Sequence, residues 1–184
     1  GVRRRALAIR LRWLGEGHPE LAESYSNLGT LLYKRGDLDG ALVPLRRALA
    51  LWRQGGAGAV SLALSNLGVV LTERGEHAEA EALLRESLAL RLAAHGEDNG
   101  AVAHVRMNLA VALAGQGRLV EGERLLREAL EAWRRTEGDH LVLARTHAAL
   151  GKVLLGLGRL EEAEESLGEA LRRYQRLFPG GHPE

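Results

Sequence analysis

The sequence predicts an all-α protein, an α-solenoid of tandem antiparallel helix hairpins, and three observations lead to this fold class. Alanine, leucine, arginine and glutamate dominate a chain of 184 residues of which only 4% are aromatic, and this composition favours helices over strands. Apolar residues recur at helical spacing along the chain. A set of small residues also repeats four times at nearly constant intervals.

The repeat is marked by a triplet of the type Asn-Leu-Gly, which occurs at 27–29, 66–68, 108–110 and 149–151. Seven residues after each triplet stands a glycine, namely Gly36, Gly75, Gly117 and Gly158. Five residues later comes a small residue, namely Ala41, Ala80, Gly122 and Ala163. A second small residue follows seven positions further on, namely Ala48, Ser87, Ala129 and Ala170. Four copies keep one register, so the chain is built from repeated units.

Each repeat contains two amphipathic helices joined by a glycine turn. In the second repeat, apolar residues at helical spacing lead up to Gly75, and a second apolar stripe begins at Ala80. Gly75 stands where a helix ends in a left-handed residue, a conformation that glycine adopts without steric cost. Gly68 and Ala80 are small, which lets the two helices of a hairpin approach closely. The pattern predicts nine helices, near residues 2–14, 19–34, 38–53, 59–74, 77–94, 101–115, 119–135, 140–156 and 160–177.

The organisation predicted for the chain is one repeat array over residues 1–184. Its first 14 residues match the second helix of a further copy, and its last seven resemble the linker at 14–20. We therefore expect a fragment of a longer array. The expected parts are a truncated repeat and linker at 1–17 and repeats at 18–58, 59–100, 101–139 and 140–184, the last including the start of a following linker.

Composition argues against several classes of function. A net charge of +1 does not call for nucleic acid or an anionic membrane as a partner. The absence of cysteine excludes disulfides and thiolate metal sites. The basic N-terminal segment 1–14 is too short and too charged for a membrane span and is a poor signal peptide, so we expect a cytoplasmic protein.

No motif for catalysis or for cofactor binding stands out. The glycine-rich segment 55–58 has no following Lys-Ser/Thr and no preceding strand, which argues against a phosphate-binding loop. Four of the seven histidines lie in or beside linkers. His140 and His147 are seven residues apart, with no third ligand at helical spacing to complete a metal site. We therefore expect no enzyme activity, no cofactor and no metal.

The pattern Tyr25-x-x-Leu28-Gly29-x-x-Leu32, followed by Ala41 and Leu45, resembles the tetratricopeptide repeat. The period of about 42 residues and the Leu-Gly-x-x-His-Pro linker at 14–19 resemble the kinesin-light-chain type of this repeat. The resemblance spans nearly the whole chain and implies a right-handed superhelix whose first helices line a concave groove. There are three departures from the pattern: the linker at 55–58 lacks His-Pro, the third copy has Ala110 and Gly122, and the fourth has Ala149.

The resemblance implies a protein–protein interaction scaffold that binds a peptide or a partner segment in this groove. Asn27, Asn66 and Asn108 align in a row, and an asparagine amide offers the donors and the acceptor that a peptide bond requires. The alternatives for these residues are an inter-repeat hydrogen bond or a solvated surface. Five further groove candidates are polar residues of the first helices: Tyr33, Lys34, His104, Arg145 and Lys152. Cations among them suit an acidic peptide or a C-terminal carboxylate, or else form an ordinary solvated face.

Two other hypotheses remain open from the sequence. The array can be the sensor arm of a larger regulatory protein, such as a signalling ATPase. It can also associate with itself through apolar hairpin faces at the repeat ends. Trp52, Trp133 and Tyr174 occupy equivalent positions late in second helices, where we expect packing beneath the inter-repeat linker, or alternatively a partner contact.

Overall fold

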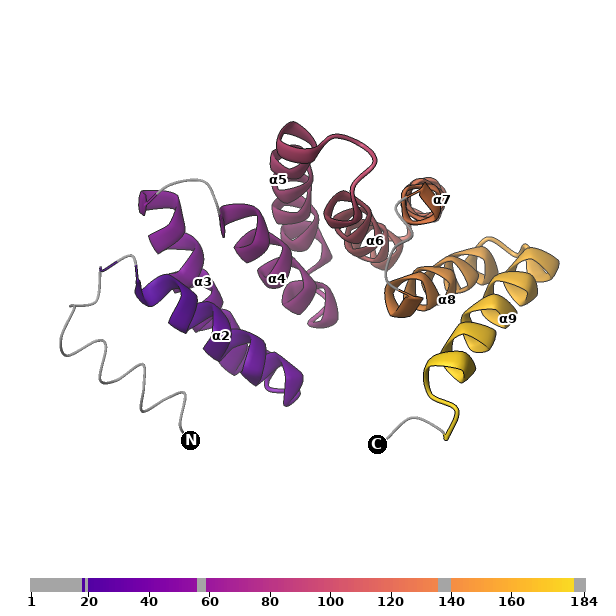
Figure 1. Cartoon of the computed structure of the whole chain (residues 1–184), viewed down its shortest axis with the longest axis horizontal. Coiled ribbons are helices and arrows are strands. Elements are labelled where there is room, and N and C mark those ends of the chain that lie inside the picture. The colour runs from indigo at the N-terminus through magenta and orange to yellow at the C-terminus, as the bar shows by residue number, and fades with distance from the viewer. Residues whose placement is uncertain (1–17, 19, 56–58, 136–139, 181–184) are drawn as a thin grey trace. The chain divides into compact units, whose positions relative to one another are not determined.

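The computed structural model describes residues 18, 20–55, 59–135 and 140–180, and every regular element in this part of the chain is an α-helix (Figure 1). The all-α prediction is therefore confirmed, and the helix bounds agree with the predicted ones within two residues. The helix expected at 2–14 lies outside the described residues. The helices are α2 Leu21–Lys34, α3 Leu38–Gly55, α4 Val60–Glu73, α5 His77–His95, α6 Gly100–Gly115, α7 Leu119–Arg135, α8 His140–Gly156 and α9 Leu160–Leu177.

The chain divides into two compact units, Gly1–Ser87 and Leu88–Glu184, with the boundary inside α5. In the first unit, α2 pairs with α3, and α4 packs against both α3 and α2. In the second unit, α6 pairs with α7 and α8 with α9, and α8 packs against both α7 and α6. Within each unit, the later first helix (α4 or α8) thus packs against both helices of the preceding hairpin, which is the packing of an α-solenoid. The predicted division into repeats stays a prediction.

The turn between the helices of each hairpin has the same hydrogen-bond pattern. At Gly75, φ is 84°, the glycine N–H donates to the Thr72 carbonyl at 3.1 Å, and the Glu76 N–H donates to the Leu71 carbonyl at 2.9 Å. This is the Schellman motif, which satisfies the last carbonyls of the first helix and needs a left-handed residue. The same two bonds and a positive φ recur at Gly36, Gly117 and Gly158, so the predicted helix stops are confirmed.

Close helix approach explains the small residues of the repeat. A Cβ added to Gly68 would lie 2.7 Å from the Leu84 Cγ on the facing helix, which is too short for a carbon–carbon contact. Gly29 and Gly151 meet Leu45 and Leu167 in the same way, each at 2.5 Å. The expected close approach is confirmed, and its nearest partner at Gly68 is a leucine side chain.

In the third hairpin the small residue has moved to the other helix. Ala110 stands where the neighbouring repeats have glycine, and Gly122 stands where they have alanine. A Cβ on Gly122 would lie 3.1 Å from the Ala110 carbonyl oxygen. The third hairpin thus has one glycine at this pair of positions, as its neighbours do, but the glycine faces the backbone of residue 110 and not a leucine side chain.

The large aromatic residues pack mostly as expected. Trp133 is buried, and a Cβ on Gly100, the first residue of α6, would lie 2.7 Å from its ring. The Trp133 ring therefore packs beneath the end of the linker that precedes α6, as predicted. Trp52 packs on a core cluster of α2 and α3 residues that includes Leu21 and Leu51. Tyr174 is half-buried.

Candidate functional site

The eight predicted groove residues all lie on first helices. Four belong to the first unit, where α2 carries Asn27, Tyr33 and Lys34 and α4 carries Asn66. Four belong to the second unit, where α6 carries His104 and Asn108 and α8 carries Arg145 and Lys152. The row of three asparagines is therefore divided between the two units. Asn27, Lys34, Arg145 and Lys152 are exposed, and the other four are half-buried.

Tyr33 connects two first helices of the first unit. Its hydroxyl donates to the Glu73 carboxylate at 2.5 Å, a bond from the last turn of α2 to the end of α4. A hydrogen bond to a charged acceptor is among the stronger ones. It holds the two helix ends side by side, so Tyr33 has a structural role whatever else it contacts.

The asparagine side chains differ in whether they have interaction partners within the protein. The Asn108 side-chain nitrogen is buried and has no hydrogen-bond partner among the described residues. A buried amide donor without a partner costs about 1–3 kcal/mol, and a ligand would reach this nitrogen only after the side chain had changed its conformation. Asn27 has a contact of its own within the chain.

The charged residues of first and second helices are used differently. Guanidinium groups of the second helices pair with carboxylates, as in Arg46–Glu79 at 2.8 Å, Arg53–Glu86 at 2.6 Å and Arg127–Glu162 at 3.1 Å. The exposed first-helix cations Lys34, Arg145 and Lys152 make no ion pair with any residue that the structure describes. The polar face of the first helices thus keeps cations that a partner can bind.

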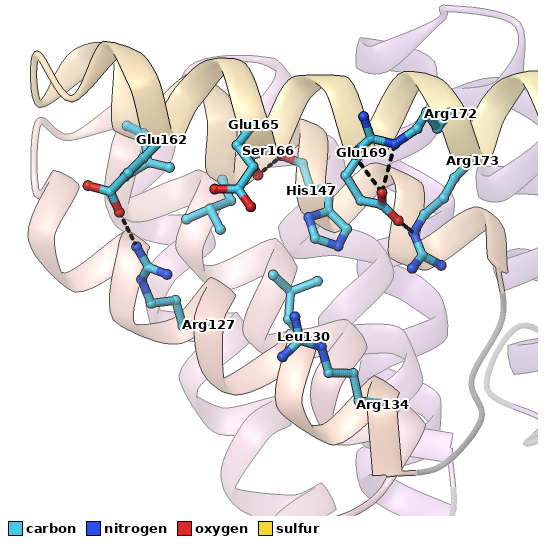
Figure 2. Close-up of a pocket in the computed structure, with 12 residues that line it drawn as sticks. Arg127, Leu130, Arg134, His147, Glu162, Glu165, Ser166, Glu169, Arg172 and Arg173 are labelled. Carbon is cyan, nitrogen blue, oxygen red and sulfur yellow. Dashed lines mark hydrogen bonds and ion pairs between the residues drawn. The ribbon is translucent and has the colours of Figure 1, made fainter.

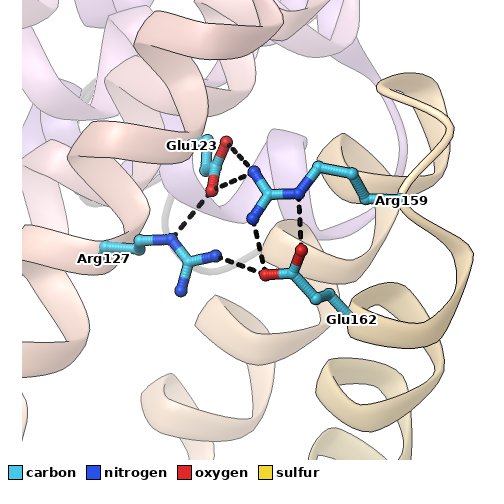
Figure 3. A network of polar contacts seen from close by, with 4 residues as sticks. All are labelled: Glu123, Arg127, Arg159 and Glu162. Carbon is cyan, nitrogen blue, oxygen red and sulfur yellow. Dashed lines mark hydrogen bonds and ion pairs between the residues drawn. The ribbon is translucent and has the colours of Figure 1, made fainter.

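A four-membered network joins α7 to the start of α9 in the second unit (Figure 3). The Arg159 guanidinium lies 2.7 Å from Glu123 and 2.5 Å from Glu162, and Arg127 bonds to the same two carboxylates. The hydrogen bonds that Arg159 donates to the Glu162 carboxylate lower the pKa of Glu162 and raise the pKa of Arg159. The network is a brace between consecutive hairpins, and the sequence analysis did not find it. A spacing of 33 to 36 residues between an arginine and a glutamate of successive second helices is the signal that was available.

A pocket of about 340 Å³ lies between α7 and α9, with α8 as its floor (Figure 2). His147 and two leucines, Leu150 and Leu154, contribute from α8. The remaining lining residues come from α7 and α9: Arg127, Leu130, Arg134, Glu162, Glu165, Ser166, Glu169, Arg172 and Arg173. Burial lowers the pKa of His147, and Arg173 lowers it further against the opposing effect of Glu169. The pocket contains none of the residues predicted to line the groove.

The described part of the chain has no group of three or more histidine, aspartate or glutamate side chains placed to hold a metal ion. In the same part, no helix has both the length and the apolarity to span a bilayer.

Tandem helix hairpins with Schellman turns and a shared apolar core define a helical repeat protein of the α-solenoid class. The sequence profile of the tetratricopeptide repeat family matches residues 3–54, 60–119 and 101–176. The chain therefore belongs to the tetratricopeptide repeat family, and its long-period repeats are of the kinesin-light-chain-like type. None of the curated proteins compared with the sequence matches it.

Several solved structures are similar to the chain. BtubC (BKLC) from P. vanneervenii is 25% identical over 99% of this chain and 74% of its own, with a TM-score of 0.79. A kinesin light chain with nearly identical TPR-like repeats from Podosopora anserina is 18% identical over 95% of this chain and 85% of its own, with a TM-score of 0.73. Aspartyl phosphate phosphatase F from Bacillus subtilis is 11% identical over 86% of this chain and 41% of its own, with a TM-score of 0.72. The last two likenesses concern the fold alone.

Proposed function

We propose that this chain is a protein–protein interaction scaffold that holds a peptide or a partner segment on the polar face of its first helices. One observation carries the proposal: the exposed first-helix cations Lys34, Arg145 and Lys152 have no ion-pair partner among the described residues, whereas second-helix guanidiniums are mostly paired. Charges that the protein leaves without a partner in either unit are the ones a ligand can pair with. The tetratricopeptide repeat is a general protein-interaction fold, which supports the coarser part of the proposal.

The chemistry of this face favours an extended acidic peptide. Asparagine amides at 27, 66 and 108 offer the donors and the acceptor that match a peptide backbone. Lysine and arginine add attraction for acidic side chains or for a C-terminal carboxylate. Tyr33 and Glu73 already bond to each other and set the spacing of the α2 and α4 ends.

The proposal is tested with a peptide selected from a display library against the unaltered chain. Asn66→Asp and Asn108→Asp each replace an amide donor with a carboxylate of the same shape, so each variant is expected to weaken peptide binding at least about tenfold. Gln175→Glu on the exposed face of α9 is the matched control, because it makes the same chemical change on a second helix. Equal affinities for all three variants at unchanged helicity would contradict the proposed binding face.

The other expectations from the sequence, about the parent protein, self-association, location and catalysis, also stay proposals. A regulatory arm of a larger protein is the second candidate, and a nucleotide-binding domain elsewhere in the same gene would favour it. Self-association through the repeat ends, a cytoplasmic location and the lack of enzyme activity stay predictions, the last supported by a family that consists mainly of non-catalytic scaffolds.

A further inference from the structure

The groove between successive second helices is closed in the first unit. There Arg53 of α3 reaches across to Glu86 of α5 at 2.6 Å, and Arg46 reaches Glu79 at 2.8 Å. The position beneath this groove on α4 is Leu64, which is fully buried. The charged groups that face each other across this groove are thus already paired with each other, and the residue beneath them is apolar.

The equivalent groove of the second unit is bridged at one end only. Arg127 pairs with Glu162 as Arg46 pairs with Glu79. At the other end the repeat places Arg134 and Glu169 where Arg53 and Glu86 stand. Arg134 instead pairs with Glu131 of its own helix at 3.0 Å, and Glu169 binds Arg172 and Arg173 of its own helix at 2.9 and 2.6 Å. The second cross-groove bridge is therefore replaced by the open end of the pocket, as Figure 2 shows.

The floor of the pocket differs as well. His147 occupies the place of the buried Leu64, and one repeat earlier the same place holds Arg106, whose long side chain is buried beside Glu97 and Glu128. Histidine is shorter than arginine but no smaller than leucine, so the space above His147 corresponds to the missing cross-groove ion pair. The Nδ1 atom of His147 is buried without a hydrogen-bond partner among the described residues, and its backbone carbonyl accepts a bond from Ser166 at 3.0 Å.

The charges around this space favour one negative group. The charges are unevenly distributed along the groove. Glu162 and Glu165 lie toward the Arg127 end, whereas Arg172 and Arg173 lie with Arg134 at the open end (Figure 2). The carboxylates paired with these three open-end arginines are Glu131 and Glu169, so the open end has one net positive charge while His147 is neutral. A monoanion neutralises this open end, and a dianion would overcompensate it.

We infer that the open end of this pocket is a binding site for a single carboxylate of a partner molecule, which takes the cross-groove place that Glu86 fills in the first unit. Arg134 is its main contact, with Arg172 or Arg173 opposite and His147 beneath. The carboxylate can come from an aspartate or glutamate side chain or from a C-terminus. The arginines of this site lie on the second helices α7 and α9, and His147 is not among the residues of the binding face proposed for the first helices, so the inference does not depend on that proposal.

The test uses three small probes and the full chain. N-acetylalanine represents a C-terminal carboxylate, N-acetylaspartate N-methylamide represents an acidic side chain, and N-acetylalanine amide is the neutral control. The ring signals of His147, assigned with His147→Gln, report binding by nuclear magnetic resonance. We expect saturable shifts with at least one acid probe and none with the amide. A shift with one acid probe only identifies the source of the carboxylate.

Two arginine variants at equivalent positions make the test specific. Arg134→Gln is expected to weaken binding of the acid probe at least about fivefold, because a charge-assisted contact is lost. Arg53→Gln in the groove of the first unit is expected to change the affinity for the acid probe less than about twofold. Both arginines are about half exposed or more, so both variants are expected to fold, which circular dichroism checks. No shift with either acid probe, or equal weakening by both variants, would overturn the inference.

The pH dependence gives a second readout. The groups that face His147 are Arg127 and Arg134 of α7 and Glu162, Glu165, Glu169, Arg172 and Arg173 of α9. Burial and the nearby arginines lower the pKa of His147 in the free protein, and a bound carboxylate raises it. Binding therefore takes up protons and is expected to tighten as the pH falls from about 8 to about 6. The same pH dependence in His147→Gln would overturn the placement of the carboxylate above this ring.

Discussion

Replacing Gly68 with alanine measures how closely the two helices of a hairpin approach. The added Cβ would lie 2.7, 3.0 and 3.2 Å from three carbons of the Leu84 side chain, which is fully buried and has little room to move. Overpacking of this kind costs about 1–3 kcal/mol. Alanine in a helix interior also gains about 0.5–1 kcal/mol over glycine, so the observed change is the difference between these two effects.

A second glycine separates the two contributions. Gly168 also lies inside a helix, and a Cβ there would meet only the Arg172 Nη1 atom, at 3.4 Å. Gly168→Ala is therefore expected to stabilise the protein by about 0.5–1 kcal/mol. Gly68→Ala is expected to be less stable than Gly168→Ala by about 1–3 kcal/mol, the cost of the contact with Leu84. Urea unfolding followed by far-ultraviolet circular dichroism gives both values.

A double-mutant cycle attributes the cost to Leu84. In a Leu84→Ala background the obstructing side chain is gone, and Gly68→Ala should then stabilise the protein as Gly168→Ala does. An equal change in stability on Gly68→Ala in both backgrounds would show that Leu84 does not obstruct the added methyl group. Equal stabilities of Gly68→Ala and Gly168→Ala would show the same.

Two further predictions concern the turns and the brace between hairpins. Gly75→Ala is expected to lower the free energy of unfolding in urea by about 1–2 kcal/mol, because φ is 84° at this residue. No neighbouring atom lies within 4 Å of the added Cβ, so this loss reflects the backbone conformation alone. A stabilising effect would refute the left-handed turn. Arg159→Gln is expected to lower the urea midpoint slightly by removing contacts with Glu123 and Glu162, and the difference from the unaltered chain is expected to shrink in high salt because the pairs are partly exposed. A difference that does not respond to salt would show that the contacts act through packing.

Most of the fold could be predicted because its signals are local. The glycine that ends each first helix, such as Gly75, carries its own conformational requirement, and apolar spacing defines the helices on either side. The burial of Trp133 also follows from its place in the repeat. These features depend on residues a few positions apart, so the sequence contains what is needed to predict them.

The spacing of 33 to 36 residues indicates which arginines and glutamates can meet across successive second helices, but it does not determine which of these ion pairs form and where a pocket stays open. Arg134 has Glu131 on its own helix and Glu169 across the groove as candidates, and it pairs with the first. Glu169 has two arginines one turn away and pairs with both. Differences of a fraction of a kcal/mol decide between such surface pairs, and residue spacing does not resolve them.

The exchange of Ala110 and Gly122 bears on how such repeats can diverge. One methyl group has been added to the first helix and one removed from the second, so the volume at the crossing is conserved while neither helix alone keeps its pattern. A Cβ at position 122 would meet the backbone of residue 110, whereas a Cβ on Gly29, Gly68 or Gly151 would meet a leucine side chain of the facing helix. The close contacts therefore differ between hairpins, and a helix transplanted from one repeat into another is expected to need repacking of the helix it faces.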